Sequence, residues 1–261
     1  MALALVDAAA DAGADIVKFQ TFVADRLATR GADKAEYQKR TSAATESQFD
    51  MLRRLELTRP MHEAIMARCR ERAIEFLSTG FDISSVDLLV SLGITTFKVP
   101  SGEITNLPYL RHVGALGGSV ILSTGMASLA DIDGAIRALE AAGTPRSRIT
   151  LMQCTTQYPA PFADANLRAI PALSRRFGVP VGFSDHTPGI EAAIAAVALG
   201  ATIIEKHFTL DRTLPGPDHA ASLEPPELNA LVAAIRNVEA ALGDGEKRPM
   251  PSEIAITGIA R

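Results

Sequence analysis

Residues 180–209, PVGFSDHTPGIEAAIAAVALGATIIEKHFT, decide the fold of this chain. A short apolar run at 180–184 precedes a helical pattern at 189–199, and a second apolar run follows at 201–206. Gly200 follows the helical run, where a glycine commonly ends a helix. The segment therefore predicts two parallel strands joined by a helix.

The same alternation of short β-rich runs and amphipathic helical patterns continues along nearly all of the 261 residues, which is typical of parallel α/β proteins. Gly13, Gly93 and Gly143 mark helix ends in the same way as Gly200. We expect strands at 15–20, 75–79, 95–99, 119–123, 149–154, 180–184 and 201–206. We expect helices at 1–14, 48–55, 60–73, 84–92, 107–116, 129–142, 165–177, 189–199 and 226–242.

Seven strands are compatible with two architectures. A TIM (β/α)8-type barrel needs eight strands, whereas an open doubly wound sheet accepts seven. Because the first helix has no strand before it and a barrel begins with one, we expect a barrel whose first strand is missing here. The polar segment 26–46 is too long for an ordinary βα loop, so it forms either a lid or an excursion that packs on the rim.

The bulk composition narrows the partners and the compartment. With 47% hydrophobic residues the chain reads as globular, and a net charge of -4 without a long basic run argues against nucleic acid. No membrane-spanning or export segment is visible. Cys69 and Cys154 are far apart, so neither a disulfide framework nor a cysteine metal site is supported. A cytoplasmic protein fits best.

Polar residues cluster at the predicted strand ends, which form one rim of a barrel. Lys18 and Lys98 would bind an anion there, with hydroxyls of Ser101, Ser123 and Ser184 completing a phosphate cradle. A substrate with carboxylate and phosphate groups is the natural expectation. The alternative is that the lysines only extend to the rim and the serines cap the following helices.

Two histidines end successive predicted strands, His186 in SDHT and His207 in EKHF. Neutral imidazoles at neighbouring strand ends can share a metal ion, with water and substrate oxygens in the remaining positions, although a lone histidine is more often structural. Asp185 either orients His186 or is a surface partner. His62 and His112 fall in helices, where we expect them to face solvent.

Six phrases in this order resemble the bacterial sialic acid synthase (N-acetylneuraminate synthase) family. The phrases are KFQTF at 18–22, KVPSGEI at 98–104, STGMA at 123–127, SDHT at 184–187, EKHFTL at 205–210 and GPDH at 216–219. The similarity runs from Met1 to about Arg261, and six phrases together are highly specific.

The resemblance implies a TIM barrel that condenses phosphoenolpyruvate with an N-acetylated hexosamine, usually N-acetylmannosamine, to a nonulosonic acid and phosphate. It implies a divalent metal, usually Mn²⁺, on His186 and His207. It also implies a phosphoenolpyruvate site formed by Lys18, Thr79, Lys98, Ser101, Ser123 and Ser184, and a sugar site formed by Gln20, Glu103, Tyr158 and Asp218. Glu103 handles a proton in this scheme, or binds sugar hydroxyls.

Members of the family begin with a further strand and end with an antifreeze-like (SAF) domain, which completes the sugar site of the other subunit in a homodimer. We therefore expect a barrel at 1–245 and the start of a linker at 246–261. Gly80, Thr156 and Ala220 also depart from the usual residues. Two other functions remain open: a barrel that binds sugar or phosphate ligands without turnover, and a metal-dependent sugar hydrolase or epimerase.

Overall fold

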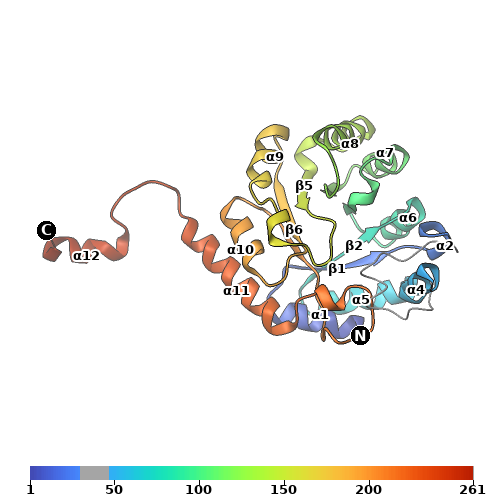
Figure 1. Cartoon of the computed structure of the whole chain (residues 1–261), viewed down its shortest axis with the longest axis horizontal. Coiled ribbons are helices and arrows are strands. Elements are labelled where there is room, and N and C mark those ends of the chain that lie inside the picture. The colour runs from blue at the N-terminus through green and yellow to red at the C-terminus, as the bar shows by residue number, and fades with distance from the viewer. Residues whose placement is uncertain (30–46, 261) are drawn as a thin grey trace.

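The computed structural model describes residues 1–29 and 47–260. Seven parallel strands form one curled sheet in chain order, from β1 to β7 (Figure 1). The strands are β1 Ile16–Thr21, β2 Glu75–Gly80, β3 Thr96–Val99, β4 Ser119–Ser123, β5 Ile149–Cys154, β6 Val181–Asp185 and β7 Ile204–Lys206. A doubly wound sheet would reverse its strand order, and this one does not. The predicted seven-stranded, barrel-type fold is confirmed.

Helices connect the strands and lie around the outside of the sheet, apart from α12 at the end of the chain (Figure 1). They are α1 Ala2–Asp11, α2 Ala24–Leu27, α4 Gln48–Leu55, α5 Arg59–Glu71, α6 Ile83–Ser91, α7 Leu107–Ala115, α8 Leu129–Ala142, α9 Ala169–Phe177, α10 Glu191–Ala198, α11 Pro225–Leu242 and α12 Pro251–Ala260. Short 3-10 turns are η1 Ser101–Glu103, η2 Arg146–Arg148, η3 Phe162–Asp164 and η4 His219–Ala221. The four glycines predicted to end helices all have positive φ.

Several of the predicted boundaries differ from the structure; the strand expected from 201, for example, begins only at Ile204. The helix expected from 165 begins only at Ala169, because Asn166 has a φ of 46° and interrupts the helical run. The polar segment 26–46 cannot be assigned as a lid or a rim excursion, since its residues 30–46 lie outside the described residues.

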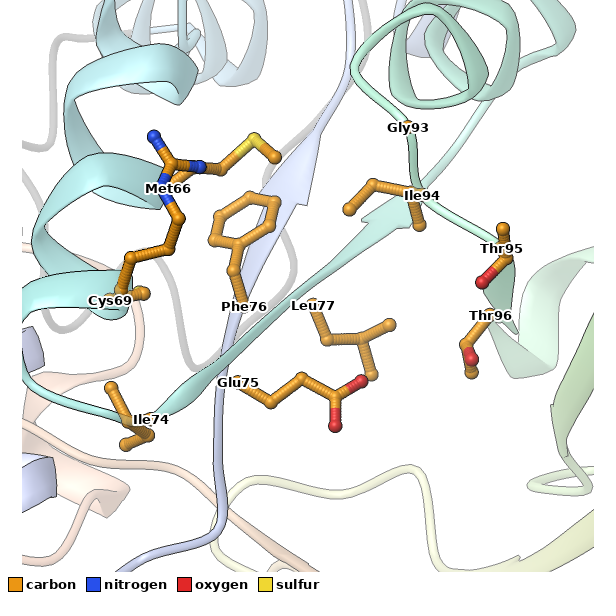
Figure 2. A pocket seen from close by; sticks show the side chains of 11 residues that line it. Met66, Cys69, Ile74, Glu75, Phe76, Leu77, Gly93, Ile94, Thr95 and Thr96 are labelled. Carbon is orange, nitrogen blue, oxygen red and sulfur yellow. The ribbon is translucent and has the colours of Figure 1, made fainter.

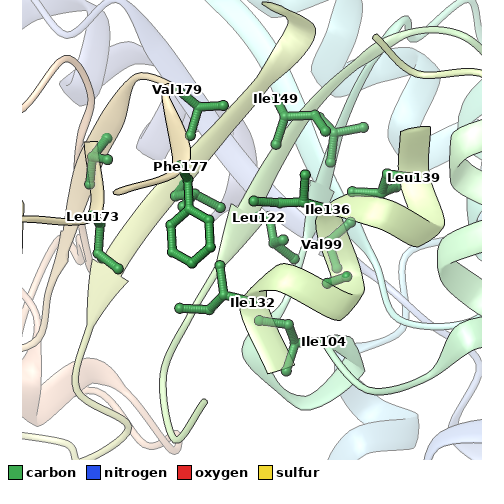
Figure 3. Packing of buried hydrophobic residues seen from close by; sticks show 14 of the residues in the cluster. Val99, Ile104, Leu122, Ile132, Ile136, Leu139, Ile149, Leu173, Phe177 and Val179 are labelled. Carbon is green, nitrogen blue, oxygen red and sulfur yellow. The ribbon is translucent and has the colours of Figure 1, made fainter. Parts of the chain in front are cut away.

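The larger core lies between the sheet and its outer helices. Figure 3 shows Leu122 of β4 and Ile149 of β5 near Ile132 and Ile136 of α8. Phe177 of α9 belongs to the same cluster. These five side chains are at most 5% exposed. The amphipathic pattern that predicted the helices thus reflects faces that pack on the strands.

A smaller apolar layer fills the inside of the curled sheet. Leu77, Ile121 and Met152 form it, with Ile203 packed against them. Gly182 is required in this layer, because an added Cβ would lie 2.5 Å from the sulfur of Met152. The layer provides an apolar floor beneath the polar residues at the carboxyl ends of the strands.

His62 does not face solvent, so that expectation was wrong. It is fully buried between α5 and the sheet, where its Nε2 lies 2.8 Å from Thr21 Oγ1 and its Nδ1 lies 2.9 Å from Thr58 O. Thr21 in turn bonds Ser78 Oγ at 2.7 Å. Thr21 of β1, which bonds Ser78 of β2 on the side of the sheet that faces α5, thus provides a partner for the buried imidazole of His62. The helical pattern of the sequence does not reveal these hydrogen-bond partners. His112 is partly exposed and bonds Asp87.

The chain ends in α12, which lies apart from the barrel in Figure 1. Its Ile254, Ile256 and Ile259 are all more than half exposed. Within 1–29 and 47–260, every helix is too short or too polar to cross a membrane.

Candidate active site

The carboxyl ends of the strands bring most of the predicted site residues together. The parallel register pairs Gln20 with Thr79 and Thr79 with Lys98 across β1, β2 and β3. On the other side of the barrel Cys154 pairs with Ser184, and Ser184 with Glu205. Because alternate residues of a strand face the same side, residues at these levels converge inside the sheet.

A lysine–carboxylate cluster, consisting of Lys18, Lys98, Ser184 and Glu205, is the centre of this arrangement. The two carboxylate oxygens of Glu205 accept hydrogen bonds from Lys98 Nζ at 2.8 and 2.7 Å. Ser184 Oγ donates to the same carboxylate at 2.8 Å, and Lys18 Nζ lies 3.5 Å from it. Lys18 also lies 3.4 Å from Thr79 Oγ1. Two ammonium groups around one carboxylate leave one net positive charge.

Glu205 was not among the predicted functional residues. In the sequence it is only the first residue of the phrase EKHF, although its spacing of two residues from His207 predicts that both side chains face the same side. Burial raises the pKa of Glu205, but the charges of Lys18 and Lys98 lower it by more. Its carboxyl group is therefore ionised throughout the physiological range and serves as an acceptor.

Lys98 is one of the most buried charged groups, with 4% of its side chain exposed. Burial lowers its pKa below the usual value, and the carboxylate of Glu205 opposes this shift. Lys18 is more accessible, at 23%. The predicted lysine pair is thus present, and it is held by a counter-ion.

His186 and His207, the histidine pair, face each other with ring centroids 5.4 Å apart. His186 Nδ1 donates to the carbonyl oxygen of Thr155 at 2.6 Å, which leaves Nε2 with a free electron pair, 3.4 Å from Ser184 Oγ. Burial lowers the pKa of both imidazoles to about 4, with Lys18 adding to the shift at His207. Both rings are neutral at pH 7 and able to donate to a metal.

Tyr158 and Asp218 complete the surroundings of the histidine pair. The ring centroid of Tyr158 lies 4.2 Å from the ring centroid of His186 and 5.4 Å from that of His207. Asp218 Oδ2 is 3.7 Å from His207 Nδ1. Burial raises the pKa of Asp218. This carboxyl group therefore holds a proton at a higher pH than an exposed aspartate.

The donor chemistry of the histidine pair fits a divalent metal. The two rings are neutral and follow successive strands, and His207 lines the cavity between β1 and β7. Within the described ranges no group of three or more histidine, cysteine, aspartate or glutamate side chains is arranged to hold a metal. A metal would therefore take its remaining ligands from water or substrate oxygens.

The predicted Ser101 lies close to Cys154 and Thr156 beside Gly125. The backbone N–H of Gly125 donates to Ser101 Oγ at 2.9 Å, and Ser101 Oγ lies 3.3 Å from the sulfur of Cys154. An added Cβ at Gly125 would lie 2.3 Å from Thr156 Oγ1. Glycine is thus needed here to leave room for these polar groups.

Gln20 lines the same cavity as Lys18 and Glu205, whereas Glu103 does not. Glu103 is in η1, where its carboxylate accepts a hydrogen bond from Asn106 Nδ2 at 2.6 Å. Gln20 is exposed at the end of β1. Neither residue has a hydrogen bond to the lysine–carboxylate cluster among the interactions seen within residues 1–29 and 47–260. Ser123, one of the predicted phosphoenolpyruvate ligands, lies at the end of β4 and is buried, with 5% of its surface exposed.

Asp185 is not a surface partner, because it is fully buried and forms an ion pair with Lys206 at 2.8 Å. Asp185 also accepts hydrogen bonds from the backbone N–H and the hydroxyl of Thr187, and Lys206 donates to Thr187 O. These contacts fix the residues that follow β6 and flank His186.

Among residues 1–29 and 47–260, two of the cavities lie near the sheet, and one of them belongs to the site. A cavity of about 480 Å³ opens between β1 and β7, and Lys18, Gln20, Glu205, His207 and Asp218 line its polar part. Figure 2 shows the other, about 310 Å³, between Cys69 of α5, the start of β2 and residues 93–96. None of the predicted site residues lines that second cavity.

Comparisons with known proteins place this chain in a family. The model of the NeuB family matches residues 5–247. N,N'-diacetyllegionaminic acid synthase of Campylobacter jejuni is 51% identical over the whole chain, which covers 78% of that protein, and the synthase of the same name from Legionella pneumophila is 46% identical, with 74% covered.

A solved relative has the same arrangement of elements. The crystal structure of N-acetylneuraminic acid (sialic acid) synthetase from Leptospira borgpetersenii superimposes with a TM-score of 0.83 at 33% identity, over 99% of this chain and 85% of that one. The matched residues 5–247 contain the lysine–carboxylate cluster and the histidine pair. The chain belongs to the NeuB family.

Proposed function

We propose that the chain condenses phosphoenolpyruvate with an open-chain N-acetylated amino sugar, giving a nonulosonic acid and free phosphate in a reaction that depends on a divalent metal. The observation that carries this proposal is the connection between the two halves of the site. Ser184 Oγ lies 2.8 Å from Glu205 in the lysine–carboxylate cluster and 3.4 Å from His186 in the histidine pair. An anion site and a candidate metal site therefore adjoin.

The anion half would bind phosphoenolpyruvate. Ammonium groups and hydroxyls are suitable donors to phosphate and carboxylate oxygens. The proposed ligands are Lys18, Thr79, Lys98, Ser101, Ser123 and Ser184, as predicted from the sequence. Burial of Lys98 strengthens its attraction for an anion, because little water screens the charge.

The reaction forms one carbon–carbon bond and breaks one carbon–oxygen bond. C3 of phosphoenolpyruvate attacks the aldehyde carbon of the sugar, water adds at C2, and the bond between C2 and the phosphate oxygen breaks. The atoms of phosphoenolpyruvate, sugar and water thus appear in the nonulosonic acid and phosphate. Lys18 and Lys98 would hold the phosphate charge from substrate to product.

His186 and His207 would hold the metal, for which the family resemblance implies Mn²⁺. When bound, the metal would polarise the aldehyde oxygen as a Lewis acid and orient the two substrates. The contribution of the chain is to keep both imidazoles neutral near pH 7, and the carbonyl of Thr155 fixes the tautomer of His186.

The aldehyde oxygen needs a proton once the new bond has formed. Asp218 is a candidate donor, since its pKa is raised by burial and it lies 3.7 Å from His207. Glu103, the residue that the sequence suggested for proton handling, would reach the sugar from η1, together with Gln20 and Tyr158. The roles of Asp218 and Glu103 can be separated by the pH dependence of each single variant.

Two acceptor sugars are candidates. The resemblance noted in the sequence implies N-acetylmannosamine. The two relatives at 51% and 46% identity are named for a product with two N-acetyl groups, which favours a diacetamido sugar as the acceptor of this chain. We therefore propose the diacetamido sugar first and N-acetylmannosamine second.

Phosphate release from phosphoenolpyruvate tests the proposal directly. The chain would be incubated with Mn²⁺ and either sugar, with and without EDTA, beside His186→Ala and the control His112→Ala, whose histidine bonds Asp87 on the outer helices. We expect sugar-dependent release that EDTA and His186→Ala abolish and His112→Ala leaves unchanged. Binding of both substrates without release would favour the alternative of a binding barrel without turnover.

Three further features expected from the sequence are also proposals. The resemblance implies a homodimer and a division into a barrel at 1–245 and a linker at 246–261, and the composition favours a cytoplasmic location. The position of α12 apart from the barrel supports this division (Figure 1). Sedimentation of the purified chain would test the homodimer.

A further inference from the structure

Glu205 has no part in the proposed bond changes, yet it makes the closest contacts in the anion half of the site. Both of its oxygens accept hydrogen bonds from Lys98 Nζ, so the buried ammonium directs two of its three N–H bonds at this carboxylate. The hydroxyl of Ser184 donates to it as well. Lys18 Nζ lies 3.5 Å from it, so one residue contacts three of the proposed phosphoenolpyruvate ligands at once.

An ammonium group as buried as that of Lys98 is unstable without a counter-ion. Removal from water disfavours the charged form, and a positive neighbour disfavours it further. The ionisable groups that interact with Lys98 within the described residues include Glu205, Lys18, His207 and Cys154. Lys18 is a cation, His207 is a neutral imidazole and Cys154 is a buried thiol, so Glu205 is the close permanent anion among these four.

We propose that Glu205 is a positioning residue, which keeps Lys98 charged and holds its ammonium and the Ser184 hydroxyl in place before the substrate anion arrives. A site organised in this way does not need to take up a proton when it binds an anion. Without Glu205, the empty site would hold an uncharged Lys98, and anion binding would have to bring a proton with it. This inference rests on the anion site of the proposed function.

The protonation of Lys98 can be measured without any ligand. The full chain would be labelled with ¹³C-lysine, and the Cε shift of Lys98, assigned by its loss in Lys98→Met, would be followed against pH. In Glu205→Gln we expect the midpoint of this titration to fall by about 1–3 pH units relative to the unchanged chain, the range for loss of an adjacent opposite charge. Glu205→Asp retains the charge and should give a smaller shift.

The consequence for binding can be measured with sulfate, which does not titrate in the relevant range. Calorimetry in two buffers of different ionisation enthalpy reports the protons taken up on binding. We expect proton uptake to be larger in Glu205→Gln than in the unchanged chain, approaching one proton, with affinity falling up to tenfold per pH unit above the Lys98 midpoint. Far-UV circular dichroism would confirm that each variant is folded, and Glu205→Asp provides the comparison if Glu205→Gln does not fold.

Two results would overturn the inference. One is an unchanged Lys98 midpoint in Glu205→Gln, because the carboxylate would then not be what keeps the ammonium charged. The other is tighter sulfate binding by Glu205→Gln at every pH, because Glu205 would then only compete with the anion. Failure of the unchanged chain to bind sulfate would overturn the proposed anion site instead, and the ligand-free titration distinguishes that case.

Discussion

The buried ion pair of Asp185 and Lys206 offers the sharpest test of how the strand ends are held. Lys206→Met removes the ammonium that lies 2.8 Å from the carboxylate of Asp185, and methionine fills a similar volume without a charge. The side chains of Asp185 and Lys206 are 0% and 3% exposed, so water cannot replace the lost partner. We expect this single change to destabilise the fold strongly.

The contacts that remain set the size of the effect. Breaking a buried ion pair by removing one partner costs about 3–5 kcal/mol, because the other charge stays buried. Asp185 keeps the hydrogen bonds from the N–H and hydroxyl of Thr187, which places the expected loss near the lower end, about 3 kcal/mol. In the double variant Asp185→Asn/Lys206→Met neither charge remains, and the loss should be smaller than the sum of the single losses by about 1.5 kcal/mol or more.

Urea unfolding followed by far-UV circular dichroism gives the free energy of unfolding of each variant. The matched control is Arg137→Met on α8, because the ion pair of Arg137 with Asp133 is exposed and should contribute less than about 1 kcal/mol. The reasoning fails if Lys206→Met loses no more stability than Arg137→Met, or if the losses of the two single variants add within about 0.5 kcal/mol in the double variant.

Three further predictions concern the site. His207→Ala should remove Mn²⁺ binding in calorimetry while circular dichroism stays unchanged, and retained affinity would contradict the metal assignment. Lys98→Ala should raise the KM for phosphoenolpyruvate at least tenfold and the KM for the sugar much less, whereas equal changes in steady-state kinetics would count against its phosphate role. Because His186 and His207 have pKa values of about 4 when folded and about 6.5 when unfolded, the unfolded chain binds more protons, and stability should fall as pH decreases from about 6.5 to about 4. Urea midpoints measured across this range should show less of this fall in His186→Ala and His207→Ala.

The fold could be predicted from the sequence because its strongest signals are local. Helical periodicity and short apolar runs located each of the seven strands, and the outer face of the barrel is packed as those patterns require. The errors came from interactions between segments distant in sequence. His62 appeared to lie on a solvent-facing helix, but Thr21 of β1, 41 residues away, is its hydrogen-bond partner.

The candidate site was predictable in part, for a similar reason. The lysines, serines and histidines were identified by residue type at strand ends, and Lys18, Lys98, Ser184, His186 and His207 do converge. A counter-ion cannot be identified in this way, since it depends on which side chains meet across the barrel. Lys98 and Glu205 are 107 residues apart in the chain.

Two three-residue phrases, SDH at 184–186 and EKH at 205–207, explain how both halves of the site are built at once. The register pairs Ser184 with Glu205 and Asp185 with Lys206, so the two phrases run side by side along β6 and β7. Since successive residues of a strand face opposite sides, the first and third residues of each phrase contribute to the site, while Asp185 and Lys206 point away and pair. The outward ion pair therefore holds in register the two strands that carry Ser184, Glu205 and the histidine pair. Loss of that ion pair should thus weaken metal and anion binding together, although neither residue contacts a ligand in the proposed reaction.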